Sequence, residues 1–487
     1  MALKRIAFGV ATLSAARMFQ LASSFVAIPI LARLLTPTDF GLAALALSMV
    51  MFFTMIGDAG LGRSLVRIDD KDSEAWSTAF WASNLLMLAL AALVFLLSWP
   101  SAAFFDQPGL APIMMTLALA PLLLGIVEIP AASLLQKEKF QWLAAAEFAA
   151  ALAGIAVALA VAFQGGGAWA LVWQHLTQRI VKAIVVLFAS RFRVRFVFNS
   201  SRLVEHFGFM RDTAAWSMVM FVGRQADTLI VGKFLGAATL GLYNIAVRIM
   251  QLPVNILGGS LHSAIYPRLV SVRDNKEALR EIILFATMAQ AVFVFPPIAA
   301  VAGASDAFFT LLLSERWRAS GEIFTLLAGT AALQTVVAIN GSLLQAVGKT
   351  GARLRLTVEY AVLWTISALV AAQFSIEAVA LGCTLVTVLY TPRLLQLYLR
   401  PIDQPIMDFI RVLAAPALVA LAIFTAHRAL VAAFEIGHWT QIGLAVLETL
   451  IGYALLVGLG RRDMLVRLQN VRAIMSPATP PDAIAAK

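Results

Sequence analysis

The stretch "RLLTPTDFGL" (Arg33–Leu42) joins two long apolar segments, and "KFLGAATLGL" (Lys233–Leu242) repeats its pattern 200 positions later. Each joint contains a cation, a pair of bulky apolar residues and a short turn that ends in Gly-Leu. In the first joint, Thr36 suits the cap of the following helix, Pro37 its first position and Asp39 its third. The repeat predicts that one hairpin of membrane helices was built twice.

The composition is that of a membrane protein. Of the 487 residues, 61% are hydrophobic and 13% are charged, and the mean hydropathy is +0.86. Apolar runs of about 20 residues, the length that crosses a hydrocarbon core, recur from end to end. We therefore predict an all-α polytopic membrane protein of about 14 transmembrane helices. The predicted spans are 12–34, 39–61, 76–99, 112–134, 142–163, 168–189, 213–235, 240–264, 281–303, 322–346, 354–373, 376–398, 409–427 and 440–459.

The distribution of cations predicts the orientation. Of the 37 Lys and Arg residues, 27 fall on the side of the N-terminus and five inside spans. The five on the opposite side are Arg33, Lys233, Arg316, Arg318 and Arg428. By the positive-inside rule both termini are cytoplasmic, and the first apolar run is an uncleaved helix rather than a signal peptide. The net charge of +10 then follows from topology and anionic lipid, without nucleic acid as a partner.

Six predicted spans precede a basic segment at 190–212 and six follow it, so the two joints have the same orientation. This predicts an N-lobe (1–189, helices 1–6) and a C-lobe (213–398, helices 7–12) joined by the cytoplasmic linker 190–212. Helices 13–14 (399–460) and a disordered cytoplasmic tail (461–487) follow. Transporters of this plan hold their substrate between the lobes. A chance similarity of two apolar hairpins is the alternative explanation of the repeat.

Two blocks around the joints resemble a known family. They are "ARLLTPTDFGLAALALSMVMFFTMIGDAGLGRSLVR" (32–67) and "GRQADTLIVGKFLGAATLGLYNIAVRIMQLPVNILGGSLHSAIYPRL" (223–269). They are similar to the bacterial polysaccharide transporters, the Wzx-type flippases of the MOP exporter superfamily, in the colanic-acid-type branch. The resemblance implies a bacterial inner-membrane flippase for O-antigen, capsule or exopolysaccharide synthesis. It would move undecaprenyl-pyrophosphate-linked oligosaccharide units to the periplasmic leaflet, with membrane lipids, a polysaccharide polymerase and chain-length machinery as candidate partners.

Such a substrate carries a diphosphate, which favours cations that face a wet lumen, because Arg binds phosphate with two hydrogen bonds. A cation inside a span is costly enough to be treated as functional. For Arg179 and Lys182, snorkelling to the cytoplasmic interface is an alternative. The candidate substrate-binding residues are Arg17 and Gln20 on the first helix, Arg179 and Lys182 on the sixth, Arg224 on the seventh, and Arg248, Gln251 and Asn255 on the eighth.

Four residues are candidates for ion coupling or gating: Asp58, Asp227, Arg33 and Lys233. Asp227 either binds a coupling ion or neutralises Arg224 one helical turn away. We expect the two joints to meet when the cavity faces the cytoplasm. The side chains of Arg33 and Lys233 are then expected to extend to the membrane interface. The contact is expected to run through the apolar pairs 34–35 and 234–235.

The loops opposite the basic side are short, for example "QGGGAW" and "QFSIEA". They leave no room for a soluble catalytic domain, and the chain has no HExxH, P-loop or GxSxG motif. The single cysteine, Cys383, rules out an intrachain disulfide and a cysteine metal cluster. We predict a transporter and not an enzyme, with no cofactor or metal. Another MOP-type transporter, for peptidoglycan precursors or drugs, is the alternative, and a membrane glycan polymerase or ligase is a weaker one.

Overall fold

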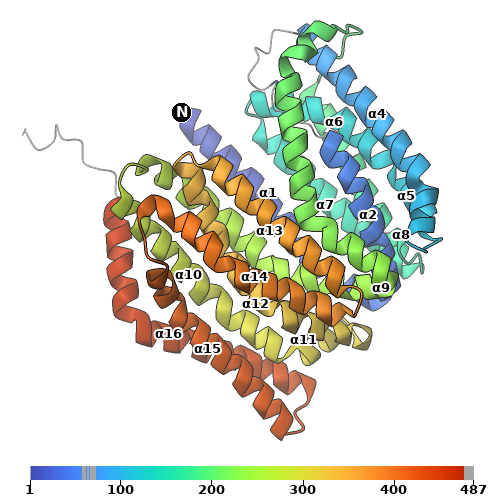
Figure 1. The fold of residues 1–487 in the computed structure, drawn as a ribbon. Helices are drawn as coiled ribbons and strands as arrows, with labels where there is room; N and C mark the ends of the chain where they lie inside the picture. Colours follow the sequence, from blue (N-terminus) through green and yellow to red (C-terminus); the bar gives the residue numbers. More distant parts are fainter. Residues whose placement is uncertain (1, 58–61, 63–64, 66–72, 476–487) are drawn as a thin grey trace, which may run out of the picture. The chain divides into compact units, whose positions relative to one another are not determined.

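A computed structural model describes residues 2–57, 62, 65 and 73–475, and no strand occurs among them (Figure 1). The side chains of some helical residues, Arg17 and Asn255 among them, lie outside the described part. The α-helices are α1 (Ala2–Leu34), α2 (Pro37–Gly57), α4 (Ser73–Phe104), α5 (Leu110–Leu117), α6 (Leu119–Gln136), α7 (Phe140–Phe163), α8 (Trp169–Ser190), α9 (Ser200–Ser271), α10 (Lys276–Gly303), α11 (Ser305–Leu312), α12 (Arg318–Ala346), α13 (Thr350–Ala371), α14 (Ile376–Leu399), α15 (Ile406–Ala433) and α16 (His438–Met475).

The described part of each predicted span is helical to within a few residues at its ends. In the described part, 12 helices are long and apolar enough to cross a membrane. One of them, Met210–Val254 within α9, takes in the seventh predicted span and most of the eighth, and α1 is not among the 12. A multi-pass membrane protein is therefore confirmed, whereas the number 14 stays a prediction.

Local sequence explains where the helices bend or continue. α9 bends at Gly236, whose φ of 80° and ψ of 171° are open to glycine but not to residues with a Cβ. Beyond the bend, α9 continues through Pro253, so that proline does not end the eighth span. The span predicted at 112–134 is divided at Ala118 into α5 and α6. α16 continues to Met475, and the first part of the predicted disordered tail (461–475) is therefore helical.

The helices form two compact units, each described separately. Unit 1 contains α1–α8 and α9 as far as Asn244, with the short segments 312–316 and 368–376, and unit 2 contains the rest. In unit 1, α7 packs against α1 and α8. Its buried face is made of small residues, Ala151, Gly154, Ala158 and Ala162, which let membrane helices approach closely. The predicted division into lobes at 1–189 and 213–398 stays a prediction.

In unit 2, α10 packs against α12, α15 and α16. Ion pairs reinforce the end of this group where α10 and α15 begin. Arg280 of α10 pairs with Asp408 of α15, and Lys276 with Asp403 at 2.5 Å. The hydrogen bond and charge of Lys276 hold the pKa of Asp403 below its ordinary value. The predicted helices 13 and 14 are thus attached to α10.

Candidate functional site

The two repeated joints touch each other inside unit 1. A Cβ on Gly41 would lie 1.7 Å from the carbonyl oxygen of Ala237, and a Cβ on Gly241 would lie 1.8 Å from the carbonyl oxygen of Pro37. Both contacts obey the same 200-residue offset, since 37 corresponds to 237 and 41 to 241. The contact is therefore reciprocal, like the interface of a symmetric dimer. Its closeness depends on glycine, because each helix backbone occupies the space of the other's missing side chain.

The predicted capping of the first joint is confirmed. The Thr36 hydroxyl accepts a hydrogen bond from the backbone N–H of Asp39 at 3.2 Å, and Asp39 Oδ2 accepts one from the backbone N–H of Thr36 at 2.9 Å. The other carboxylate oxygen, Oδ1, accepts from the backbone N–H of Ala168 at 3.0 Å. Asp39 thereby ties the start of α2 to the turn between α7 and α8, and this holds the joint rigidly within its unit.

Below the joint, α2 lies along the first half of α9. Leu45 fills the space above Gly232, where a Cβ would lie 2.4 Å from the leucine Cδ2. Ser48 donates a hydrogen bond to Gln225 Oε1 at 2.8 Å. At the far end the rings of Phe52 and Phe221 lie 5.0 Å apart. The positions 41, 45, 48 and 52 form one face of α2, and this face, with its partners on α9, is called the seam below.

Two charged side chains on α9 next to the seam, Asp227 and Lys233, have partners. Asp227 is buried, and its Oδ2 accepts a hydrogen bond from the Tyr243 hydroxyl at 2.7 Å. Lys233 pairs with Asp106 at 3.0 Å, and its ammonium lies 4.9 Å from the centre of the Phe104 ring. The cation of the second joint is thus anchored to the turn after α4, whereas Arg33 in the first joint is exposed.

A second cluster of charges lies deeper in unit 1. A cavity of about 280 Å³ between α1, α6, α7 and α8 is lined by Glu128, Glu147, Arg179 and Lys182 among apolar residues. Lys182 Nζ lies 2.5 Å from Glu147 Oε1, with 34% of the lysine side chain and 19% of the glutamate side chain exposed. Glu128 Oε2 accepts from the Ser83 hydroxyl at 2.8 Å. The cavity therefore contains both acids and cations, and an anionic ligand would have to compete with Glu147 for Lys182.

Comparison with known proteins supplies the family. The profile of a family described as "polysaccharide biosynthesis protein" matches residues 30–322, more than half of the chain. The chain belongs to this family. The succinoglycan biosynthesis transport protein ExoT of Rhizobium meliloti is 26% identical over 305 residues, which are 62% of each chain. The lipopolysaccharide biosynthesis protein WzxC of Escherichia coli is 25% identical over 324 residues, 65% of each chain. The match thus spans about three-fifths of the length of these relatives.

Solved structures with the same fold are also known. The lipid II flippase MurJ in an inward closed conformation has a TM-score of 0.75 at 14% identity, and the match covers 93% of this chain and 99% of that one. An inward-facing multidrug resistance MATE transporter of the MOP superfamily has a TM-score of 0.64 at 15% identity, covering 81% of this chain and 98% of that one. At these identities the likeness shows the fold alone.

The structure brings together only some of the residues that the sequence singled out in this polysaccharide biosynthesis protein. Arg179 and Lys182 share the cavity of unit 1, and Gln20 is half-buried on α1 in the same unit. Arg224 is exposed on the first half of α9. In unit 2, Arg248 is half-buried and Gln251 is exposed. The side chains of Arg17 and Asn255, and the whole of Asp58, lie outside the described residues.

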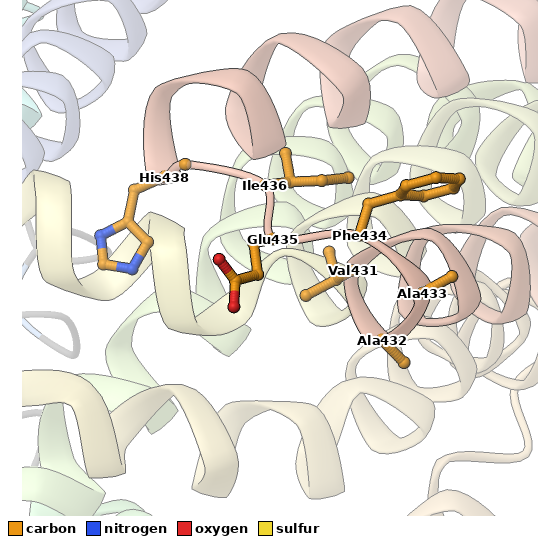
Figure 2. Close-up of a pocket in the computed structure, with 8 residues that line it drawn as sticks. Val431, Ala432, Ala433, Phe434, Glu435, Ile436 and His438 are labelled. Atoms are coloured by element: carbon orange, nitrogen blue, oxygen red, sulfur yellow. The ribbon is translucent and has the colours of Figure 1, made fainter.

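The seam contains functional candidates that sequence reasoning missed. The structure shows the joints touching at Gly41 and Gly241, each against the backbone of the other joint, while the expected contact between residues 34–35 and 234–235 stays a prediction. Extending the 200-residue offset to every position of the joints would have matched Pro37 with Ala237, the residues that face Gly241 and Gly41. A cavity of about 600 Å³ at the α15–α16 turn (residues 431–438) is no such candidate. Figure 2 shows its Phe434 pointing away from Glu435 and His438, so its side chains do not converge on a ligand.

Proposed function

We propose that this polysaccharide biosynthesis protein is a flippase of the bacterial inner membrane. It moves undecaprenyl-pyrophosphate-linked oligosaccharide units from the cytoplasmic to the periplasmic leaflet by alternating access, and is not an enzyme. Family membership and the names of ExoT and WzxC, a transport and a lipopolysaccharide biosynthesis protein, support this proposal. The proposal includes cytoplasmic termini, and a polysaccharide polymerase and chain-length machinery as partners.

The observation that carries the proposal is the reciprocal contact of the repeated joints. Alternating access needs a contact that closes one end of the transporter and can open again. The contact at Gly41 and Gly241 is built from backbone atoms of α2 and α9. Such a contact leaves few side chains to rearrange when it opens. The repeated joint, which lies on the predicted periplasmic side, is therefore assigned as the periplasmic gate.

The paired charges of the unit 1 cavity suit the substrate proposed. A cation buried alone is costly in a membrane, and the Glu147 carboxylate offsets this cost for Lys182 when no substrate is bound. The diphosphate would take over that role, aided by Arg179. Arg17 and Arg248 are proposed as further contacts of the diphosphate.

Reconstitution tests the function directly. The purified chain is placed in liposomes with a fluorescent undecaprenyl-pyrophosphate-linked disaccharide, and a membrane-impermeant quencher measures the lipid that reaches the outer leaflet. We expect faster appearance than in protein-free liposomes, and slower appearance with Arg17→Ala or Arg248→Ala. Lysine at either position should restore only part of the rate, because it lacks the bidentate fork. No acceleration with this lipid, but acceleration with a peptidoglycan precursor, would favour the alternative transporter, and elongated glycan products would favour an enzyme.

A further inference from the structure

Unit 2 contains a cavity with polar side chains among apolar ones, and none of the predicted site residues lines it. It has a volume of about 240 Å³ and is formed by α12, α13 and α14. Three helix faces line it: Gln334 and Gly341 from α12, Arg353, Thr357 and Tyr360 from α13, and Thr387, Thr391, Leu394 and Tyr398 from α14. Within each set the spacings are three, four or seven residues, so each set is one face of its helix. We call this cavity the unit 2 pocket.

The unit 2 pocket runs inward from one end of the three helices. Arg353 lies in the first turn of α13, and Tyr398 lies in the last turn of α14. Tyr360 is seven residues further along α13, which is about 10 Å at about 1.5 Å per residue. The pocket thus has a cationic end near the helix termini and a neutral polar end nearer the middle of the spans.

The neutral end is organised by a directed chain of hydrogen bonds. Thr387 donates its hydroxyl proton to the carbonyl oxygen of Cys383 at 2.9 Å. The Tyr360 hydroxyl, 2.9 Å from Thr387 Oγ1, must therefore donate to it. Tyr360 in turn accepts from the Gln334 side-chain amide at 3.0 Å. This sequence of donors fixes the orientation of Gln334, whose carbonyl oxygen is left to accept a hydrogen bond from a ligand in the pocket.

The cationic end of the pocket is the guanidinium of Arg353. Arg353 makes no ion pair with any residue of the described part, whereas its neighbour Arg355 pairs with Glu359 at 2.8 Å. Glu359 also pairs with Arg393 at 2.9 Å, so this acid is already occupied. A Cβ at Gly341 would lie 3.3 Å from Arg353 Nε. The missing side chain of Gly341 makes the room in which the guanidinium lies.

Two aromatic rings, Tyr360 and Tyr398, also line the pocket. The Tyr360 ring lies 5.7 Å from Trp364 and 5.9 Å from Tyr390, centre to centre. Rings packed in this way are held in place and present flat apolar faces beside polar groups. Hydroxyl, amide and guanidinium groups around an aromatic wall match a sugar ring, which has apolar C–H faces and an edge of hydroxyl groups.

We propose that the unit 2 pocket binds one sugar ring that carries an anionic group, with the anion on Arg353 and the ring hydroxyls on Gln334 and Tyr360. This inference rests on the proposed function and makes it more specific, because it identifies a glycan subsite in unit 2 that is separate from the cations of unit 1. The volume of about 240 Å³ lies below the roughly 300–1,000 Å³ of drug-sized sites. It therefore suits a single ring rather than a whole repeat unit.

The anionic group has two possible sources. It is either the phosphate on the first sugar of the lipid-linked substrate or the carboxylate of an acidic sugar within the repeat unit. Glucose 1-phosphate represents the first source and glucuronic acid the second. Unmodified glucose has the ring hydroxyls but no anionic group, and inorganic phosphate has the anion but no ring. Each can therefore make only part of the proposed contacts.

Calorimetric titration of the full chain in lipid nanodiscs tests the proposal. At least one of the two anionic sugars should bind more tightly than glucose or phosphate. Arg353→Gln should raise its Kd by about 10- to 100-fold, the loss expected for a hydrogen bond to a charged group. Arg355→Gln, on the same helix but outside the pocket, should change Kd less than threefold. Tyr360→Phe keeps the ring and breaks the hydrogen-bond chain, and should weaken binding of the sugar but not of phosphate.

Two results would overturn the proposal: neither anionic sugar binds the unaltered chain at millimolar concentration, or each binds the Arg353→Gln and Arg355→Gln variants equally well. The outcome is separate from that of the transport test. If anionic sugars bind through Arg353 but no lipid moves, the sugar site is supported and the flippase proposal is contradicted. If no sugar binds and Arg353→Gln leaves lipid movement unchanged, only the sugar-site proposal is contradicted.

Discussion

Replacing Gly41 by alanine should force the two joints apart. The new Cβ would lie 1.7 Å from the Ala237 carbonyl oxygen, while non-bonded heavy atoms rest at about 3.5 Å. The joints must therefore separate locally by roughly 1.5–2 Å, which removes most of their dispersion contact. Gly241→Ala makes the same demand at Pro37, where the distance is 1.8 Å.

The energetic effect can be bounded. Overpacking of one added methyl in a tight contact costs about 1–3 kcal/mol. If the joints also exist in a separated state, in which the methyl meets no obstacle, the whole cost falls on the touching state. The ratio of separated to touching molecules should then rise by about 5- to 150-fold in either variant. The rate of lipid movement should fall, because the cycle must pass through the touching state.

Distances between spin labels measure this ratio. Labels on Thr38→Cys and Ala238→Cys, both exposed positions, are read in a Cys383→Ser background, since Cys383 is the only cysteine. The matched control is Gly443→Ala in α16, where a Cβ has no neighbour within 4 Å. The control should keep the original distance distribution. Unchanged distributions in both Gly41→Ala and Gly241→Ala, with full membrane levels, would refute the gate and leave the repeat as a sign of ancestry alone.

Two further predictions concern topology and charge. Reporter fusions at Asn199 and Asn275 should lie in the cytoplasm and one at Gly166 in the periplasm, and any one on the wrong side would contradict the orientation. Glu147→Gln and Lys182→Gln should each lower the melting temperature, because each leaves one charge unpaired in the cavity of unit 1. The double variant should recover part of the loss, with a coupling of about 1 kcal/mol for a pair that is partly exposed. Losses that simply add would mean that the pair contributes nothing to stability.

The helices and the first joint could be predicted because their signals are local. Apolar runs of about 20 residues define spans, and Thr36, Pro37 and Asp39 make a cap that depends only on neighbours in sequence. α16 shows the limit of this reasoning. Its polar end past 461 carries no apolar run, yet the helix continues to Met475. There Arg467 lies 3.6 Å from Glu281 of α10, a tertiary ion pair that a hydropathy window does not register.

The site was only partly predictable, for a different reason. A search for charged stripes found Arg179 and Lys182 but not Glu147, the partner of Lys182 on α7, because pairing depends on how two helices turn toward each other. The same search passed over the face of α13 that begins at Arg353, since its other members are a threonine and a tyrosine. Glycine was missed as well. The need for glycine at position 41 can be recognised only when the position of the opposing Ala237 backbone is known.

A second feature, which lies outside both joints, supports the predicted duplication. In unit 1, Glu147 of α7 pairs with Lys182 of α8, 35 residues later. In unit 2, Glu359 of α13 pairs with Arg393 of α14, 34 residues later. Each pair links the two helices of one hairpin, the fifth and sixth predicted spans in the first case and the eleventh and twelfth in the second. The two pairs differ in their cation, lysine in the first and arginine in the second, but both have the acid on the first helix of the hairpin and the cation on the second. Two hairpins that each keep an acid and a cation at nearly the same separation are difficult to attribute to chance similarity of apolar sequence. They favour the predicted duplication over chance similarity as the explanation of the repeated joints.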